Sequence, residues 1–335
     1  MNTLRNTLAA ALTVLAGATA AHADEVEMKI ATDSGPKGSP AGDAIEMWAR
    51  LVEEKTAGTE DEITIDVFYQ DELGDQKEVF DLFVVGEVDM MLNWPLTSYD
   101  KRLGLRNMPY MFFTWEQAFD AYGPGGWLNK IYNDVHNDQG LKFFGAWPEG
   151  FGGVATRGKY ATTIEGAKGL KVRVPSNFPN PQTMQTLGYQ ATAIAWGETY
   201  TSIQTGVVDG DAGNVIYWDY EYFRDVLDYY VRTKHTFATG VLSMNQESWD
   251  DLNEAQQQVV ADAALAVMSK QFEDARARDQ LYVEKAIEGG MEYIEPTEEE
   301  IRAFAIAARE QVWPLMEDEL GAEIVEAVKA NAPQP

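Results

Sequence analysis

The chain has 335 residues, 45% of them apolar and 11% aromatic, so it is long enough and apolar enough to form two domains. It contains no cysteine, which excludes disulfides, thiolate catalysis and cysteine-ligated metal sites. Its formal net charge of -28 disfavours contact with nucleic acid or with an anionic membrane surface.

Residues 1–23 have the features of a secretory signal peptide. Arg5 supplies a positive charge, an apolar run extends from Leu8 to Ala21, and Ala21-His22-Ala23 offers a cleavage site between small residues. The run is too short to favour a membrane span, although an uncleaved signal anchor stays open as an alternative. Cleavage removes one arginine and no acids, so the mature charge is -28 - 1 = -29. The mature protein is therefore expected to be exported to the periplasm.

The mature chain begins with alternating strands and helices. A strand ends near Ala31, a helix is expected over 41–55, a strand over 63–68, a helix over 77–86 and a strand over 88–93. This alternation predicts an α/β protein with a mostly parallel sheet. Ligands of such sheets bind at the carboxyl ends of the strands, where Asp33, Ser34, Asn93 and Trp94 are expected.

A second α/β unit follows residues 141–147, with strands expected over 153–157, 170–175 and 190–196. Two such units in tandem predict a cleft between two lobes. We expect lobe I to comprise 24–148 with 236–275, and lobe II 149–235 with 276–330. Residues 253–288 contain no glycine or proline, so they could form one helix of about 50 Å that braces both lobes. Two shorter helices fit the same periodicity.

Three segments carry a resemblance to a known family. They are Gly169-Leu-Lys-Val-Arg-Val-Pro, Leu187-Gly-Tyr-Gln-Ala-Thr-Ala-Ile-Ala-Trp-Gly-Glu-Thr-Tyr and Ser202-Ile-Gln-Thr-Gly-Val-Val-Asp-Gly. Their order and spacing resemble the substrate-binding proteins of tripartite ATP-independent periplasmic (TRAP) transporters. The resemblance implies a two-lobed periplasmic-binding-protein fold with a hinge and a long helix across both lobes. It also implies a small organic acid as ligand, and small and large membrane permease subunits as partners.

The resemblance assigns Arg173 as the clamp for the carboxylate of the ligand. A guanidinium suits this role because its planar donor fork matches a carboxylate. The alternative is an arginine on a solvated strand face. Some family members carry a second arginine about twenty residues earlier, where this chain has Gly153. Arg157 lies nearby and could face either the ligand or solvent.

Aromatic residues are expected around the body of the ligand. The segments containing Trp196, Asn214 and Tyr217 resemble the branch of the family that includes ectoine-binding proteins, and the segment with Trp147 and Glu149 matches one that lines the cleft. Trp196 and Trp147 are expected at strand ends. Core packing is the alternative for any single tryptophan. With Asp33, Asn93 and Trp94 closing from the first lobe, these residues complete the expected ligand site.

Catalytic signatures are missing from the sequence. It lacks a Gly-x-Ser-x-Gly elbow, and after signal cleavage only His136 and His235 remain, without metal-ligand spacing. We therefore expect no enzyme activity, no metal and no cofactor. Two alternatives stay open: a solute receptor that feeds a membrane sensor, and an exported glycoside hydrolase that uses paired carboxylates.

Overall fold

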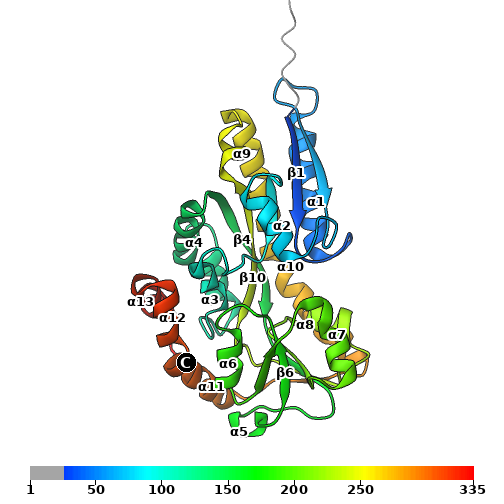
Figure 1. Cartoon of the computed structure of the whole chain (residues 1–335), viewed down its shortest axis with the longest axis vertical. Helices are drawn as coiled ribbons and strands as arrows, with labels where there is room; N and C mark the ends of the chain where they lie inside the picture. The colour runs from blue at the N-terminus through cyan, green and yellow to red at the C-terminus, as the bar shows by residue number, and fades with distance from the viewer. Residues whose placement is uncertain (1–25) are drawn as a thin grey trace, which may run out of the picture.

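The computed structural model describes residues 26–335, which form two lobes, each built around its own β-sheet (Figure 1). The predicted signal peptide, 1–23, lies outside the described residues. Within residues 26–335, no helix combines the length and the apolar character that a membrane crossing requires. The expected two-lobed α/β architecture is confirmed.

The first lobe contains a five-stranded sheet with the order β2-β1-β3-β10-β4. Its strands are β1 (Val26–Thr32), β2 (Ile63–Phe68), β3 (Met90–Asn93), β4 (Leu141–Phe151) and β10 (Phe237–Asn245). The surrounding helices are α1 (Pro40–Thr56), α2 (Gln76–Val84), η1 (Lys101–Asn107), α3 (Trp115–Tyr122), α4 (Trp127–Asp138) and α9 (Gln246–Asp250). Helix α1 begins where Pro40 follows the capping side chain of Ser39, which accepts the Gly42 N–H.

The second lobe contains a six-stranded sheet with the order β11-β9-β5-β8-β6-β7. Its strands are β5 (Val154–Thr156), β6 (Lys171–Val174), β7 (Gln190–Ala193), β8 (Gly210–Ala212), β9 (Tyr229–Val231) and β11 (Glu292–Ile294). Its helices are α5 (Ile164–Ala167), α6 (Asn180–Thr186), α7 (Trp196–Thr205), α8 (Ile216–Phe223) and α11 (Glu298–Gln311).

Both sheets are mixed, whereas the sequence predicts a mostly parallel arrangement. Strand β1 pairs in parallel with β2 and β3, but β10 runs antiparallel to β3 and β4. In the other sheet β5 runs antiparallel to β8 and β9. The reason lies in the path of the chain. Strand β5 carries it from the first lobe into the second, and β10 carries it back into the first, so both strands start at the boundary between the lobes. Their neighbours β3, β4 and β8 therefore end there.

Two short segments connect the sheets. Strand β4 leads into β5 through Gly152 and Gly153, and β9 leads into β10 through residues 232–236. The segments are hydrogen-bonded to each other, because Gly152 N–H donates to Thr236 O at 3.0 Å and Lys234 N–H donates to Gly152 O at 3.1 Å. The lobe border expected after residue 148 falls inside β4, which continues to Phe151.

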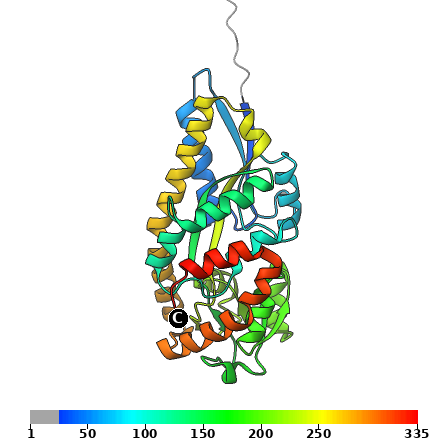
Figure 2. The ribbon, with the colours of Figure 1, turned by 90° about the vertical axis from the view of Figure 1, so that its left-hand side faces the viewer.

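A third connection is the single helix α10 (Glu254–Glu288), whose 35 residues run along both lobes (Figure 2). Val260 and Val267 pack into the core of the first lobe, while Tyr282 and Ala286 pack into that of the second. The long helix is thus one element rather than two. The absence of glycine and proline allows this continuity.

The C-terminal helices α12 (Trp313–Leu320) and α13 (Ala322–Asn331) pack on the first lobe. Trp313, Met316 and Val325 belong to the same buried cluster as Phe143 of β4 and Phe237 of β10. This differs from the expected lobe II, which extends to residue 330. The cause is that the apolar faces of both helices complete a first-lobe core, a contact that sequence periodicity does not specify.

Loss of the cap of α10 is expected to destabilise the fold. The side chain of Asn253 accepts the N–H groups of Ala255 and Gln256 at 2.9 and 3.0 Å. Asn253→Ala should lower the free energy of unfolding by about 1 kcal/mol, measured by urea denaturation. Gln258→Ala, on the exposed side of the same helix, is the control, and an equal effect of both substitutions would contradict the capping role.

Candidate functional site

The end of β1 brings Asp33 to the boundary between the lobes. Its Oδ2 accepts the backbone N–H of Trp94 at 3.2 Å and Nε2 of Gln76 at 3.0 Å. Its Oδ1 is buried and has no hydrogen-bond partner among residues 26–335. Burial raises the pKa of Asp33 to about 7, although both hydrogen bonds and the positive charge of Arg106 oppose this rise. Asp33 is thus a carboxyl group with one unused acceptor.

Asn93 and Trp147 lie deeper in the first lobe. Asn93 is fully buried, and its Nδ2 donates to Ser243 Oγ at 3.0 Å across β3 and β10, while its Oδ1 has no partner within the described residues. Trp147 is buried within β4 rather than at a strand end, contrary to the sequence prediction, because β4 continues to Phe151. Its ring packs edge-on against Trp94 at 5.9 Å.

Glu149 joins the two lobes. Its Oε2 accepts the indole N–H of Trp94 at 3.0 Å, and its Oε1 accepts that of Trp218, in α8 of the second lobe, at 2.8 Å. Burial raises the pKa of Glu149, and the two indole hydrogen bonds and the charges of Arg278 and Arg106 oppose the rise. The lobes are therefore in contact, in a closed arrangement.

Arg173 lies in β6 and is only 4% exposed. Its Nε donates to Ile194 O at 2.9 Å, its Nη1 pairs with Asp211 Oδ1 at 3.0 Å, and its guanidinium lies 5.6 Å from the ring centroid of Trp196. Within residues 26–335 its Nη2 makes no hydrogen bond. The guanidinium is thus held in one orientation, and its Nη2 remains available as a hydrogen-bond donor.

Two buried carboxyl groups and an amide lie behind Arg173. Asn214 Nδ2 donates to Asp211 Oδ2 at 2.6 Å and to Asp219 Oδ1 at 3.1 Å. Burial and the neighbouring charge of Asp211 raise the pKa of Asp219 well above its usual range. Burial also raises the pKa of Asp211, but the charge of Arg173 and its hydrogen bond to Asp211 oppose that rise.

Aromatic rings cover the second-lobe side of the site. Trp196 packs edge-on against Trp218, with 6.0 Å between the ring centroids. The ring centroid of Tyr217 lies 4.7 Å from that of Trp218 and 4.8 Å from that of Tyr282 in α10. Trp196 is the first residue of α7, not the end of a strand as predicted, because β7 ends at Ala193. Its ring still lies beside Arg173.

A small cavity lies between the lobes and α10, with a volume of about 20 Å³. Its lining includes Trp147 and Glu149 of the first lobe, Tyr217 of the second and Arg278 of α10. The guanidinium of Arg278 lies 5.8 Å from the ring centroid of Trp147. This space suits about one water molecule.

Arg157 is not part of this group. It follows Thr156, which pairs with Gly210 at the start of β8, the end remote from the lobe boundary. Its Nη1 donates to Gln204 O at 3.4 Å, near the end of α7.

Gly153 cannot be replaced by a larger residue without rearrangement. A Cβ there would lie 2.4 Å from Cζ of Tyr230, whose hydroxyl donates to Asn214 O at 3.1 Å. The tyrosine ring thus fills the space in which a side chain at position 153 would begin.

The structure brings Arg173, Trp196 and Asn214 together on one side of the boundary and Asp33, Trp94 and Glu149 on the other. The sequence-based site omits five residues that also lie there: Arg106, Asp211, Asp219, Trp218 and Arg278. Asp211 directly follows the Val-Val-Asp-Gly segment, and Trp218 directly follows Tyr217, so proximity to these motifs could have identified both. Arg106 and Arg278 carry no such signal.

Comparison with known proteins identifies the class. Residues 31–318 match the family model for bacterial extracellular solute-binding proteins, family 7. The chain belongs to this family.

Two solved structures share the fold. The chain is 25% identical to a TRAP periplasmic solute-binding protein from Ochrobactrum anthropi, with a TM-score of 0.82 and coverage of 92% of this chain and 95% of that one. That structure has the C-terminus bound in the ligand-binding pocket. It is 23% identical to a Chromohalobacter salexigens protein with bound D-glucuronate, with a TM-score of 0.82 and coverage of 91% and 99%.

Among curated proteins, the ectoine-binding periplasmic protein TeaA of Halomonas elongata is 26% identical over 230 residues, which cover 67% of each chain. The family and the shared fold therefore define a protein that binds solutes.

Asp33 should make stability depend on pH. Its folded-state pKa is raised, so the folded protein is most favoured when this group is protonated, and stability is lost as the pH rises from about 4 to about 7. Asp33→Asn should therefore be more stable than the parent by about 2 kcal/mol at pH 8, and by less at pH 4.5. Denaturant unfolding of both proteins across this range measures the difference. A difference independent of pH would contradict the assignment.

Gly153→Ala should destabilise the protein by about 1–3 kcal/mol, because the new methyl group must displace the ring of Tyr230. Gly197→Ala is the matched control, since a Cβ there meets no atom within 4 Å. Urea denaturation measures the free energy of unfolding of both variants. Equal values would show that the ring of Tyr230 can move aside without cost to stability.

Proposed function

We propose that this protein captures a small organic acid in the periplasm and delivers it to the membrane subunits of a TRAP transporter. Family membership supports solute binding, and the relatives that bind ectoine or D-glucuronate both take small molecules with a carboxylate group. In this proposal residues 1–23 direct export and are removed. The protein itself transforms nothing.

The single observation that carries the proposal is the state of Arg173. Asp211 and the carbonyl of Ile194 each take one N–H of the guanidinium, which leaves Nη2 and the second Nη1 proton for a ligand. These donors form a fork that matches a carboxylate. Trp196 lies against the same guanidinium, and both Trp196 and Tyr217 pack against Trp218, so aromatic rings flank the proposed acid site.

Closure of the lobes provides the signal to the transporter. In the closed arrangement Glu149 accepts one indole N–H from each lobe, so the closed form has contacts that an open form lacks. A ligand that touches Arg173 on one side and Asp33 on the other adds to these contacts and shifts the population towards closure. The membrane subunits would then recognise the surface that only the closed form presents.

The two histidines of residues 26–335 do not suit a role as catalytic base. Burial lowers the pKa of both His136 and His235 to about 4, so each is neutral at physiological pH. Nδ1 of His235 is hydrogen-bonded to Thr233 Oγ1 at 2.6 Å, and Nδ1 of His136 is hydrogen-bonded to the carbonyl oxygen of Tyr132 at 2.7 Å. Each ring is buried and has a low pKa, so neither histidine is an effective base.

Substitution of Arg173 tests the proposal. Arg173→Ala should weaken the binding of a carboxylate ligand by at least about 100-fold, because a buried acid loses a charged donor pair. Arg173→Lys should recover only part of this loss, since an ammonium lacks the planar fork. Isothermal titration calorimetry with D-glucuronate, ectoine and succinate measures the affinities, after unfolding and refolding to remove any bound solute.

Arg157→Ala is the matched control, as it removes an arginine of the same lobe that lies away from the boundary. Equal affinities of the parent and of Arg173→Ala would refute the clamp. Absence of binding to all three acids would refute the proposed ligand class.

A further inference from the structure

A buried ion pair lies where the two lobes are joined. Arg232 begins the connecting segment 232–236 and is 4% exposed, and its Nη1 pairs with Oδ2 of Asp279 in α10 at 2.9 Å. Within residues 26–335, Nε and Nη2 of Arg232 and Oδ1 of Asp279 are shielded from water and have no hydrogen-bond partner. Polar atoms in this state cost free energy, and the cost is larger for charged groups. The pair is therefore only partly satisfied.

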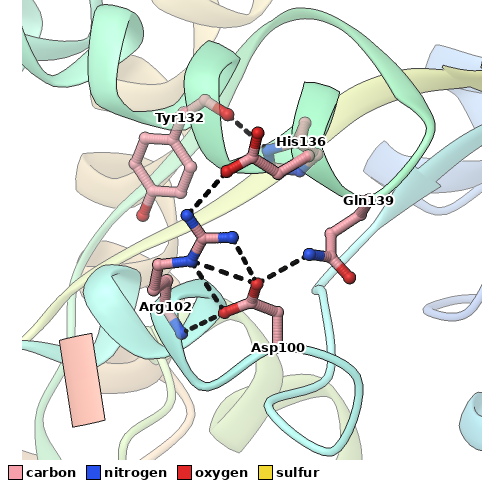
Figure 3. Close-up of polar contacts among 6 residues, drawn as sticks. Asp100, Arg102, Tyr132, His136 and Gln139 are labelled. Atoms are coloured by element: carbon pink, nitrogen blue, oxygen red, sulfur yellow. Dashed lines mark hydrogen bonds and ion pairs between the residues drawn. The ribbon is translucent and has the colours of Figure 1, made fainter. Parts of the chain in front are cut away.

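Arg102 in η1 provides a comparison, because all three of its guanidinium nitrogens are used (Figure 3). Its Nη2 pairs with Asp100 at 2.6 Å, its Nη1 pairs with Asp138 at 2.8 Å, and its Nε donates to Asp100 at 3.1 Å. The side chain of Arg102 is nevertheless 32% exposed, so water is also available to it. Arg232 is more buried and yet pairs through one nitrogen, which stability alone does not favour.

Aromatic rings hold Arg232 on the second lobe. Its guanidinium lies 5.8 Å from the ring centroid of Tyr230 in β9 and 5.6 Å from that of Tyr293 in β11. The two rings are stacked, with an interplanar angle of 8° and 6.2 Å between their centroids. Ring faces attract a cation, but they do not replace the hydrogen bonds that Nε and Nη2 lack. Arg232 is thus placed by the second lobe and moves with that lobe.

The first lobe covers the pair on another side. Oδ1 of Asp279 lies 3.7 Å from the point at which a Cβ on Gly150, in β4, would stand. Arg232 and Asp279 also line a groove of about 760 Å³, to which the first lobe contributes Trp115 and the second lobe contributes Tyr293. The shielding of the pair therefore requires both lobes, and a change in the angle between the lobes alters it.

Helix α10 separates this groove from the small cavity between the lobes. Gln271 and Arg278 line the cavity, while Arg276 and Gln280 line the groove. Gln280 follows Gln271 by nine residues, which is about two and a half turns, so their side chains leave the helix in opposite directions. Asp279 lines both spaces. When the lobes rotate about this helix, the surroundings of Asp279 therefore change on both sides.

We propose that the Arg232–Asp279 pair opposes closure of the lobes. With the lobes together its unpaired atoms are shielded, and with the lobes apart they are hydrated, so the pair favours the open form when no ligand is bound. The hydrogen bond between Glu149 and Trp218 favours the closed form, and binding of the ligand shifts the balance towards closure. This inference rests on the proposed function, because it takes the ligand to bind the closed form. Arg232 is then a positioning residue, which sets the affinity without contact with the ligand.

The test measures the distance between the lobes in the absence of ligand. Because the chain has no cysteine, spin labels attach only to Glu54→Cys in α1 and Glu165→Cys in α5, which are exposed sites in different lobes (Figure 1). Double electron–electron resonance on the full mature protein, refolded free of solute, gives the populations of the open and closed forms. Arg232→Met with Asp279→Leu removes both charges and all the unpaired atoms. The ratio of closed to open protein should then rise at least ten-fold.

Two further variants accompany this one. Arg232→Gln with Asp279→Asn keeps polar side chains without charge, so it should shift the ratio in the same direction by at least three-fold, and it carries the test if the apolar pair does not fold. Arg276→Met is the matched control and should leave the ratio within two-fold of the parent. Arg276 lines the same groove and pairs with Glu116 at 2.7 Å, but its side chain is 62% exposed.

Calorimetry adds a second measurement. For each of D-glucuronate, ectoine and succinate that the parent binds, the affinity of the variants should rise in proportion to their closed fraction. The populations are measured without ligand, so a direct contact between Asp279 and a ligand does not contribute to them.

The outcomes separate the two proposals. A ratio that is unchanged, or lower, in both paired variants refutes the hinge role of Arg232 and Asp279. An equal rise in Arg276→Met refutes it as well, because any loss of charge in the groove would then have the same effect. If the ratio rises as expected and no acid binds the parent, the hinge role stands and the proposed ligand class fails. If the acids bind and the ratio does not rise, the proposed function stands and the hinge role is wrong.

Discussion

The two hydrogen bonds accepted by Glu149 are the interaction on which the closed arrangement depends. One indole N–H comes from Trp94 at the end of β3, and the other comes from Trp218 in α8. Because Glu149 is partly buried, these bonds are stronger than they would be at the surface, and an unpaired carboxyl oxygen there would be costly. Separation of the lobes would break the hydrogen bond between Glu149 and Trp218 and would expose the site to solvent. The hydrogen bond therefore exists only while the site is closed.

The position of this group follows from the path of the chain. Each lobe is entered from the other by a strand that starts at the boundary, so the neighbours of β5 and β10 must end there. Polar residues at the ends of these strands then face one another without any long loop. The same geometry accounts for the exclusion of Arg157, which lies at the opposite end of β5.

Much of this arrangement can be predicted from sequence. The strands that lead to Asp33 and Asn93 follow from periodicity. The absence of glycine and proline allows the long helix α10, and the role expected of Arg173 follows from the resemblance to the TRAP family. The mixed sheets, the packing of α12 on the first lobe and the proximity of Arg106 to Asp33 do not. These features depend on contacts between segments far apart in the chain, and local patterns do not encode which apolar face covers which core.

The charges around the site are arranged at a cost to stability. Asp211 neutralises Arg173, Asn214 bridges Asp211 and Asp219, and Tyr230 fills the position where a side chain at 153 would begin. In the first lobe burial raises the pKa of Asp33 to about 7, and within residues 26–335 Nε of Arg106 has no hydrogen-bond partner. A fold selected only for stability would have paired these groups or removed them. Their persistence in both lobes is the expected state of a site whose missing hydrogen bonds are supplied by a ligand.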